Sequence, residues 1–208
     1  VILTHFHADH VGGLAGALRG RVVAEILASP VEDPDFLVRE VRRLGEAAGV
    51  PVRTIYAGDR LQWFGVTARV WWPARLLREG SAPNNGSVVL TAEVHGLRAV
   101  LLADVEREAA RAVLGALRRD PEFAAWAVDV VKIAHHGSAN VEPALLDLLG
   151  PVVGVISVGA GNDYGHPAPS TLADLHRRGI VVLRTDWDGD VAVGRPSSGP
   201  LLVSARGP

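Results

Sequence analysis

The chain has 208 residues, of which 48% are hydrophobic and 21% charged, and its formal net charge is -2 at pH 7. A balance so close to neutral excludes a strong general attraction to nucleic acid or to an anionic membrane, so any attraction must come from a local patch. The absence of cysteine excludes disulfides, thiolate metal ligands and a cysteine nucleophile.

Hydrophobic periodicity and turn residues predict the secondary structure along the whole chain. In the first half of the chain the expected elements are a strand at 1–4, a short helix to 18, a strand at 21–28, a helix that begins at Asp33 and Pro34 and ends at Gly49, and a hairpin over 60–73. A loop over 76–85 and a second hairpin over 87–104, with its turn at His95-Gly96, follow. In the second half we expect helices at 106–118, 141–150 and 168–179, and strands at 127–134, 152–159, 180–185 and 190–194. Strands come first and then alternate with helices, which predicts one α/β domain.

The two ends of the sequence differ in character from this domain. The chain contains no methionine and begins inside an apolar run, immediately before its richest motif, so we expect a piece of a longer polypeptide. We assign the domain to residues 1–194. Residues 195–208 are rich in Pro, Gly and Ser and predict a flexible tail.

The pattern His-x-His-x-Asp-His directly follows the first predicted strand. In an extended turn alternate side chains point the same way, so His5 and His7 can reach one metal ion, while Asp9 and His10 can reach a second. Neutral imidazole and carboxylate are the usual ligands of zinc and related ions, and two such ions can activate water and clamp an oxyanion. A polar surface turn is the alternative, but this spacing at a strand end favours metal binding.

Further candidate groups follow other predicted strands, at the carboxyl ends where α/β enzymes build their sites. Asp104 can bridge two cations, or it can cap the next helix. Of the adjacent His135 and His136, one can be a ligand and the other a proton donor or phosphate contact, or both can be a hydrogen-bonded loop pair. His166 lies in a Gly/Pro loop, and its local signal is weak.

The segment THFHADHVGG resembles the signature of the metallo-β-lactamase superfamily. Together with NNGSVVL, LLADVE, KIAHHGS, SVGAGNDYGHP and RTDWDGDV, it is similar to the C-terminal domain of ComEC-type competence proteins, which are membrane proteins of DNA uptake. The resemblance covers nearly the whole chain. It implies an αββα sandwich, classed as α/β or in some schemes as α+β, whose first strands would be missing from this chain.

The resemblance also implies a site for two divalent ions, zinc or manganese. The implied metal ligands are His5, His7, Asp9, His10, Asp104, His135 and His166. With His135 as the ligand, His136 becomes a catalytic group beside Asp9, but the pattern does not decide which of the pair ligates. The implied substrate contacts are Asn85, Ser87, Ser138 and Asn162. Two departures accompany it: Asn84, Asn85 and Ser87 occupy the region where many relatives have another histidine ligand, and Ala103 stands where the family usually has glycine.

These features predict a metal-dependent hydrolase of phosphodiester bonds, a nuclease that acts on DNA during uptake. Metal-activated water would be the nucleophile, Asp9 would orient or deprotonate it, and His136 and Ser138 would contact the phosphate. In the parent protein the domain, itself soluble, would be attached to a membrane channel at the cell membrane, outside the cytoplasm.

Two alternatives stay open. The same site chemistry serves a hydrolase of a small ester, thioester or lactone, and a non-catalytic module of a membrane transporter could bind DNA or a partner. A nuclease should show a basic, aromatic-lined groove. The candidates for such a groove are Arg39, Arg42, Arg43, Trp63, Trp71 and Trp72, with Arg177 and Arg178 as a second basic patch. The same tryptophans and arginines are better explained as core residues and a solvated helix face.

Overall fold

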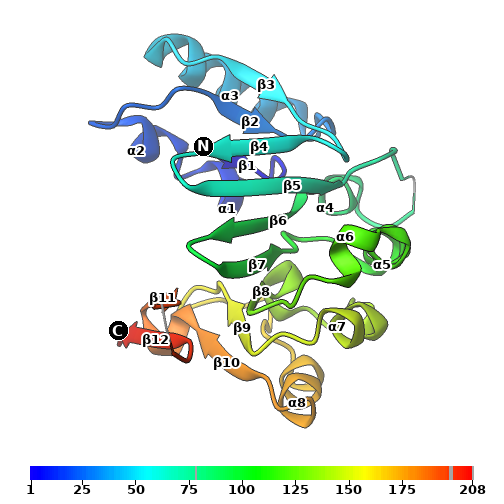
Figure 1. Ribbon diagram of the computed structural model, residues 1–208. Coiled ribbons are helices and arrows are strands. Elements are labelled where there is room, and N and C mark those ends of the chain that lie inside the picture. Colours follow the sequence, from blue (N-terminus) through cyan, green and yellow to red (C-terminus); the bar gives the residue numbers. More distant parts are fainter. Residues whose placement is uncertain (78, 197–198, 208) are drawn as a thin grey trace.

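The structure is a computed structural model that describes residues 1–77, 79–196 and 199–207. Its strands form a three-stranded sheet, a seven-stranded sheet and a two-stranded hairpin (Figure 1). Arg78, in the predicted loop, and residues 197–198 and 208, in the predicted tail, lie outside the described residues.

The first sheet is parallel and carries its helices on the outer face. Its strands are β1 (Ile2–Leu3), β2 (Ile26–Ala28) and β3 (Val52–Thr54). Its helices are α1 (Ala8–Val11), α2 (Leu14–Leu18) and α3 (Asp35–Ala48). Val38 and Val41 of α3 are buried against this sheet, and the left-handed Gly49 ends the helix as predicted. The predicted strand at 21–28 is shorter than expected.

The second sheet has the strand order β10-β9-β8-β7-β6-β5-β4. Its strands are β4 (Arg60–Trp63), β5 (Val66–Trp72), β6 (Val89–Val94), β7 (Leu97–Leu101), β8 (Val130–Lys132), β9 (Val153–Ile156) and β10 (Val181–Arg184). β4 to β7 pair antiparallel, with the predicted turn at His95-Gly96, whereas β7 to β10 pair parallel. The parallel half therefore needs long crossover connections, which bring the ends of β7, β8 and β9 to one edge.

These connections contain most of the remaining helices. The helices between β7 and β10 are α5 (Arg107–Arg119), α6 (Pro121–Ala124), the 3₁₀ turn η1 (Ala134–Gly137), α7 (Pro143–Leu149) and α8 (Pro169–Arg177). In addition, α4 (Ala82–Asn85) lies between β5 and β6, and α9 (Thr185–Asp188) follows β10. The loop predicted over 76–85 thus contains α4. Within the described part of the chain, no helix combines the length and the apolar character needed to cross a membrane.

Side-chain alternation along the strands builds a layered core. Val131 of β8 faces the helices of the second sheet, while its neighbour Val130 faces the opposite way. Between the two sheets, Leu27 of β2 packs with Val70 and Leu90 of the second sheet. The layers run helices, sheet, sheet, helices, which confirms the predicted sandwich.

The predicted flexible tail over 195–208 is wrong for part of its length. β12 (Leu202–Arg206) pairs antiparallel with β11 (Asp190–Gly194). Val191 and Val193 of this hairpin pack against apolar side chains of the second sheet. The hairpin covers sheet surface that the first sheet leaves open, and a composition rich in Pro, Gly and Ser does not reveal this long-range contact.

A glycine in the His-His-Gly turn should be essential to the fold around the site. Gly137 has φ +82°, in the left-handed region, and a Cβ there would lie 2.5 Å from Cβ of Pro167, next to His166. We expect Gly137→Ala to lower the free energy of unfolding by about 2–4 kcal/mol, because strain and overpacking add. Urea denaturation followed by circular dichroism measures this.

The matched control is Gly161→Ala, in the loop that carries His166. Nothing lies within 4 Å of a Cβ built on Gly161. Its free energy of unfolding should therefore change by less than about 0.5 kcal/mol. Equal stability of the two variants would contradict the close approach of Gly137 and Pro167.

Candidate metal centre

The His-x-His-x-Asp-His motif joins the end of β1 to the start of α1. His7 is the N-cap of α1, with φ −74° and ψ 153°, so the chain is extended up to His7 and helical from Ala8. The predicted extended turn is therefore wrong beyond His7. The structure nevertheless brings Nε2 of His5 within 3.0 Å of Nδ1 of His7, and it directs Asp9 and His10 to a separate group of side chains.

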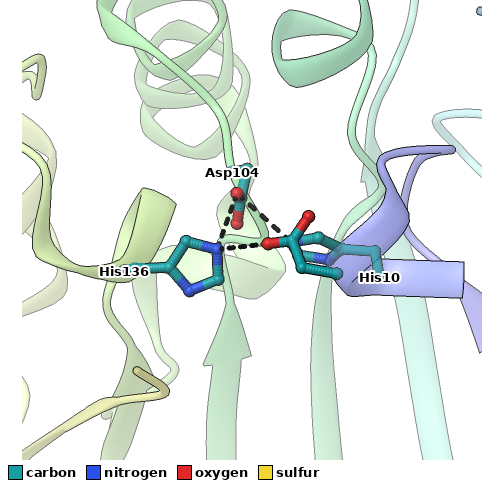
Figure 2. A group of neighbouring side chains, drawn as sticks. His10, Asp104 and His136 are labelled. Atoms are coloured by element: carbon teal, nitrogen blue, oxygen red, sulfur yellow. Dashed lines mark ion pairs between the residues drawn. The ribbon is translucent and has the colours of Figure 1, made fainter. Parts of the chain in front are cut away.

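That group consists of Asp9, His10, Asp104 and His136, whose potential ligand atoms all lie within 4.8 Å of one another. The Nε2 atoms of His10 and His136 lie 3.2 and 3.1 Å from the same oxygen of Asp104 (Figure 2). Nε2 of His136 is also 3.1 Å from an oxygen of Asp9. The four residues come from α1, from the turn after β7 and from η1, and we call them the four-residue cluster.

The two imidazoles of this cluster are oriented by hydrogen bonds at Nδ1, the ring nitrogen that faces away from Asp104. Nδ1 of His136 lies 2.7 Å from the carbonyl oxygen of Ser157 and must donate to it, and Nδ1 of His10 lies 3.2 Å from the hydroxyl of Thr4. In both rings Nε2 is buried and has no hydrogen-bond partner within the described residues. A lone pair on Nε2 of His136 would face two carboxylates, which is unfavourable unless a proton or a cation lies between them. The donor set and its supporting hydrogen bonds therefore fit a divalent cation.

Asp104 is the buried charge of the cluster, with 2% of its surface exposed. Burial alone would raise the pKa of Asp104, but its contacts with His10 and His136 and the charge of Lys132 outweigh burial and hold the pKa well below its usual range. Nζ of Lys132 donates to the second oxygen of Asp104 at 3.2 Å. Lys132 was not among the predicted site residues; the available signal was a lysine at the end of an otherwise apolar strand.

The turn into Asp104 is strained. Ala103 has φ +49°, in the left-handed region where glycine is favoured, which agrees with the expectation of glycine that the resemblance implies at this position. The carbonyl oxygen of Ala103 accepts hydrogen bonds from Nζ of Lys132 and from the backbone N–H of His135, both at 2.9 Å. These two hydrogen bonds compensate for the strain.

The structure separates the adjacent His135 and His136. His136 belongs to the four-residue cluster, whereas His135 lies beside His166, with the ring centroids 5.4 Å apart. Burial lowers the pKa of both His135 and His166, so both are neutral at pH 7. Nδ1 of each ring is buried and lacks a hydrogen-bond partner in the described part of the chain. Of the two histidines between which the sequence does not decide, His136 is the one placed among the potential ligand groups of the cluster.

A cavity of about 1080 Å³ opens onto the cluster. Besides the cluster, it is lined by His7, Asn84, Lys132, Asn162, Tyr164 and the pair His135 and His166. Asn162 was a predicted substrate contact. Its amide donates to the backbone oxygen of His166 at 2.9 Å and accepts from the backbone N–H of His166 at 3.3 Å, so it also fixes the loop that carries this histidine.

Three other predicted substrate contacts are buried outside the cavity lining, and we correct their assignment. The side-chain oxygen of Asn85 accepts backbone N–H groups at the start of α5. The hydroxyl of Ser87 lies 3.1 Å from Nδ1 of His5, which it orients. The hydroxyl of Ser138 accepts a backbone N–H two residues further on. In each of the three residues the side-chain oxygen interacts within the protein, outside the cavity lining.

The candidate residues for a basic, aromatic-lined groove follow the alternative interpretation, that of core tryptophans and a solvated helix face. Trp71 and Trp72 are buried in the core and Trp63 is partly buried, and the indole N–H groups of Trp71 and Trp72 are hydrogen-bonded. Each candidate arginine forms an ion pair with a carboxylate: Arg39, Arg42, Arg43, Arg177 and Arg178. These side chains therefore offer neither free stacking surfaces nor uncompensated positive charge.

Residues 1–160 match the family model described as the metallo-beta-lactamase superfamily. The chain belongs to the metallo-beta-lactamase superfamily. Membership of this superfamily, together with the four-residue cluster, supports a metal-dependent hydrolase that binds divalent cations.

Two curated relatives of this superfamily domain are competence proteins. ComE operon protein 3 of Bacillus subtilis (strain 168) is 31% identical over 194 residues, which are 92% of this chain and 24% of the relative. Competence protein ComA of Neisseria gonorrhoeae is 24% identical over 201 residues, which are 93% of this chain and 25% of the relative. The chain thus spans about a quarter of the length of these relatives.

Solved structures confirm the superfamily fold at low sequence identity. Zn(2+)-bound PqqB from Methylobacterium extorquens superposes with a TM-score of 0.52 and 16% identity, over 88% of this chain and 70% of that chain. The CmlA beta-hydroxylase E377D mutant superposes with a TM-score of 0.58 and 14% identity, over 88% of this chain and 42% of that chain. At these identities the likeness concerns the fold alone.

Cation affinity should depend on pH through His136. The contact with Asp104 raises the pKa of His136 above its ordinary value of 6.5, so a proton on this ring competes with a cation to a higher pH than usual. We expect the affinity for Mn²⁺ to rise with pH through the raised pKa, by up to about tenfold per pH unit, and then to level off. His5 does not contribute to the pH dependence of Mn²⁺ affinity in this range, because burial lowers the pKa of His5 to about 3.

Competition with a chelating dye between about pH 5.5 and 8.5 measures this dependence. The variant His136→Gln should bind Mn²⁺ more weakly and with a flatter pH profile, because the competing proton is gone. A His136→Gln profile as steep as that of the parent would show that His136 is not among the ligands.

Proposed function

We propose that this domain hydrolyses phosphodiester bonds of DNA as one part of a larger competence protein. The observation that carries the proposal is the four-residue cluster at the wall of a cavity of about 1080 Å³. Pockets for small molecules usually measure about 300–1,000 Å³, so a cavity at the upper end of this range leaves room for a nucleotide unit next to the cluster. The names of the two curated relatives support the context of competence.

The cluster would hold one divalent cation, and His5 and His7 would hold a second one beside it. Imidazole and carboxylate ligands suit both zinc and manganese. When bound, such cations stabilise negative charge on a phosphate oxygen and lower the pKa of water. The remaining chemistry belongs to the side chains of the cavity.

Asp9 is the accessible carboxylate of the cluster, with 61% of its side chain exposed, whereas Asp104 is buried. Asp9 can therefore approach the attacking water, orient it and accept its proton. Lys132 balances the charge of Asp104 and keeps that carboxylate in place. Because burial keeps His135 and His166 neutral, each ring retains one N–H that can donate to a phosphate oxygen.

The wider context is proposed from the relatives. The chain spans about a quarter of each competence relative, and we propose that the domain belongs to a longer polypeptide. From the resemblance to ComEC-type proteins, we propose that this polypeptide also contains a membrane channel. At the cell membrane and outside the cytoplasm, it would degrade DNA during uptake.

We expect Asp9→Asn to reduce hydrolysis of a labelled single-stranded DNA, and of a bis-aryl phosphodiester, by at least about a hundredfold at saturating Mn²⁺. An amide cannot accept the proton of the attacking water at neutral pH. The control is Asp163→Asn, which removes the same charge from an exposed position outside the cavity lining. Its rate should equal that of the parent within about twofold.

Two outcomes would count against the proposal. If Asp9→Asn cleaves DNA as fast as the parent does, Asp9 is not the proton acceptor. If the parent leaves DNA and the bis-aryl phosphodiester intact but rapidly hydrolyses a neutral ester or lactone, the domain is a small-ester hydrolase.

A further inference from the structure

The adjacent Asn84 and Asn85 have opposite environments. In Asn85, which is 1% exposed, the side-chain oxygen accepts from the backbone N–H groups of Glu106 and Ala109, and the side-chain nitrogen donates to the backbone oxygen of Glu79 at 2.9 Å. In Asn84, which is 5% exposed, the side-chain oxygen is buried without any partner in residues 1–77, 79–196 and 199–207. Asn84 alone of the two lines the cavity.

The amide of Asn84 has a defined orientation. Its nitrogen donates to a carboxylate oxygen of Glu106 at 3.1 Å, and a carboxylate can only accept, so nitrogen and oxygen cannot be interchanged. The other carboxylate oxygen of Glu106 accepts the backbone N–H of Ser81 at 3.0 Å, which fixes Glu106 in turn. The oxygen of Asn84 is therefore held away from Glu106. A buried acceptor that has lost its water without gaining another hydrogen bond is destabilising, so a binding partner for this oxygen is expected.

His5 and His7 form an incomplete set of ligands. Their facing ring nitrogens are 3.0 Å apart, so they share either a proton or a cation. On its other side, His5 is held by the hydroxyls of Ser87 and Thr4, at 3.1 and 3.2 Å. Two imidazoles supply only half of a four-coordinate site, and the described cluster of three or more ligand groups does not include them.

We propose that the side-chain oxygen of Asn84 is a ligand of the second divalent cation, the one held by His5 and His7. The proposal rests on the two-cation site of the proposed function. A neutral carbonyl oxygen is an accepted ligand of divalent ions and adds no charge. Coordination would give the unpaired oxygen its missing partner. The segment of Asn84 lies against that of His5, because the backbone N–H of Val88 donates to the backbone oxygen of Thr4 at 2.8 Å and Ser87, which holds His5, donates its backbone N–H to the backbone oxygen of Asn84. Asn84 and His7 line the same cavity. An ordered water on this oxygen is the competing explanation.

Metal binding in the absence of substrate tests the proposal. We would titrate metal-free protein with Mn²⁺, counting bound ions by mass spectrometry after dialysis and following the second ion by its electron paramagnetic resonance. The parent should bind two ions. Asn84→Leu, which keeps the shape but removes the oxygen, should retain the first ion and bind the second at least about tenfold more weakly. Asn84→Asp combined with Glu106→Gln keeps the oxygen, adds charge and leaves an amide that can donate to the new carboxylate, and it should bind the second ion about tenfold more tightly.

The matched control is Asn140→Leu, the same substitution at an exposed asparagine outside the cavity lining. It should bind two ions as the parent does. Parent-like affinity for the second ion in Asn84→Leu, or a parent that binds only one ion, would overturn the proposal. If Asn84→Leu does not fold, unchanged affinity for the second ion in the double variant Asn84→Asp, Glu106→Gln would overturn it. Because no substrate is present, a failure of the nuclease assays would leave this result unaffected.

Discussion

Asp104 is a carboxylate that stays ionised although it is almost completely buried. A buried charge must be compensated, and this one is compensated from three sides, by Lys132 on one oxygen and by His10 and His136 on the other. These partners come from β8, α1 and η1, so the charge can be satisfied only when both sheets of the sandwich are in place. The arrangement of the cavity depends on this compensation.

The polar side chains around Asp104 are of two kinds: those whose polar atoms are hydrogen-bonded within the protein, and those with a buried polar atom available to a ligand. Ser87 and Asn85 use their polar atoms in hydrogen bonds within the protein. The side-chain oxygen of Asn84 and the Nε2 atoms of His10 and His136 are buried without a hydrogen bond of good geometry among the described residues, although both Nε2 atoms lie close to Asp104. Protein interiors seldom leave such atoms unpaired. Their concentration around one cavity, on a superfamily fold that binds divalent cations, is the physical basis for the proposed chemistry.

Much of the fold could be predicted because its signals are local. The stop at Gly49, the turn at His95-Gly96 and the alternation of strands and helices follow from backbone preferences and apolar periodicity. The prediction failed where long-range contacts decide. The β11–β12 hairpin forms because it covers open surface of the second sheet, and the motif turns helical at Ala8 as the chain leaves β1.

By itself, the sequence determined which residue types gather at the strand ends, since closely spaced histidines and aspartates are recognisable without coordinates. Only the tertiary structure decided what each of them does. His135 and His136 both have positive φ, and this turn sends adjacent side chains to different partners, which no sequence spacing reveals. Lys132 of β8 and Asn84 of α4 line the cavity because segments distant in the chain meet at one edge of the sheet. Asn84 and Asn85 differ because the side-chain oxygen of Asn85 accepts hydrogen bonds and that of Asn84 does not.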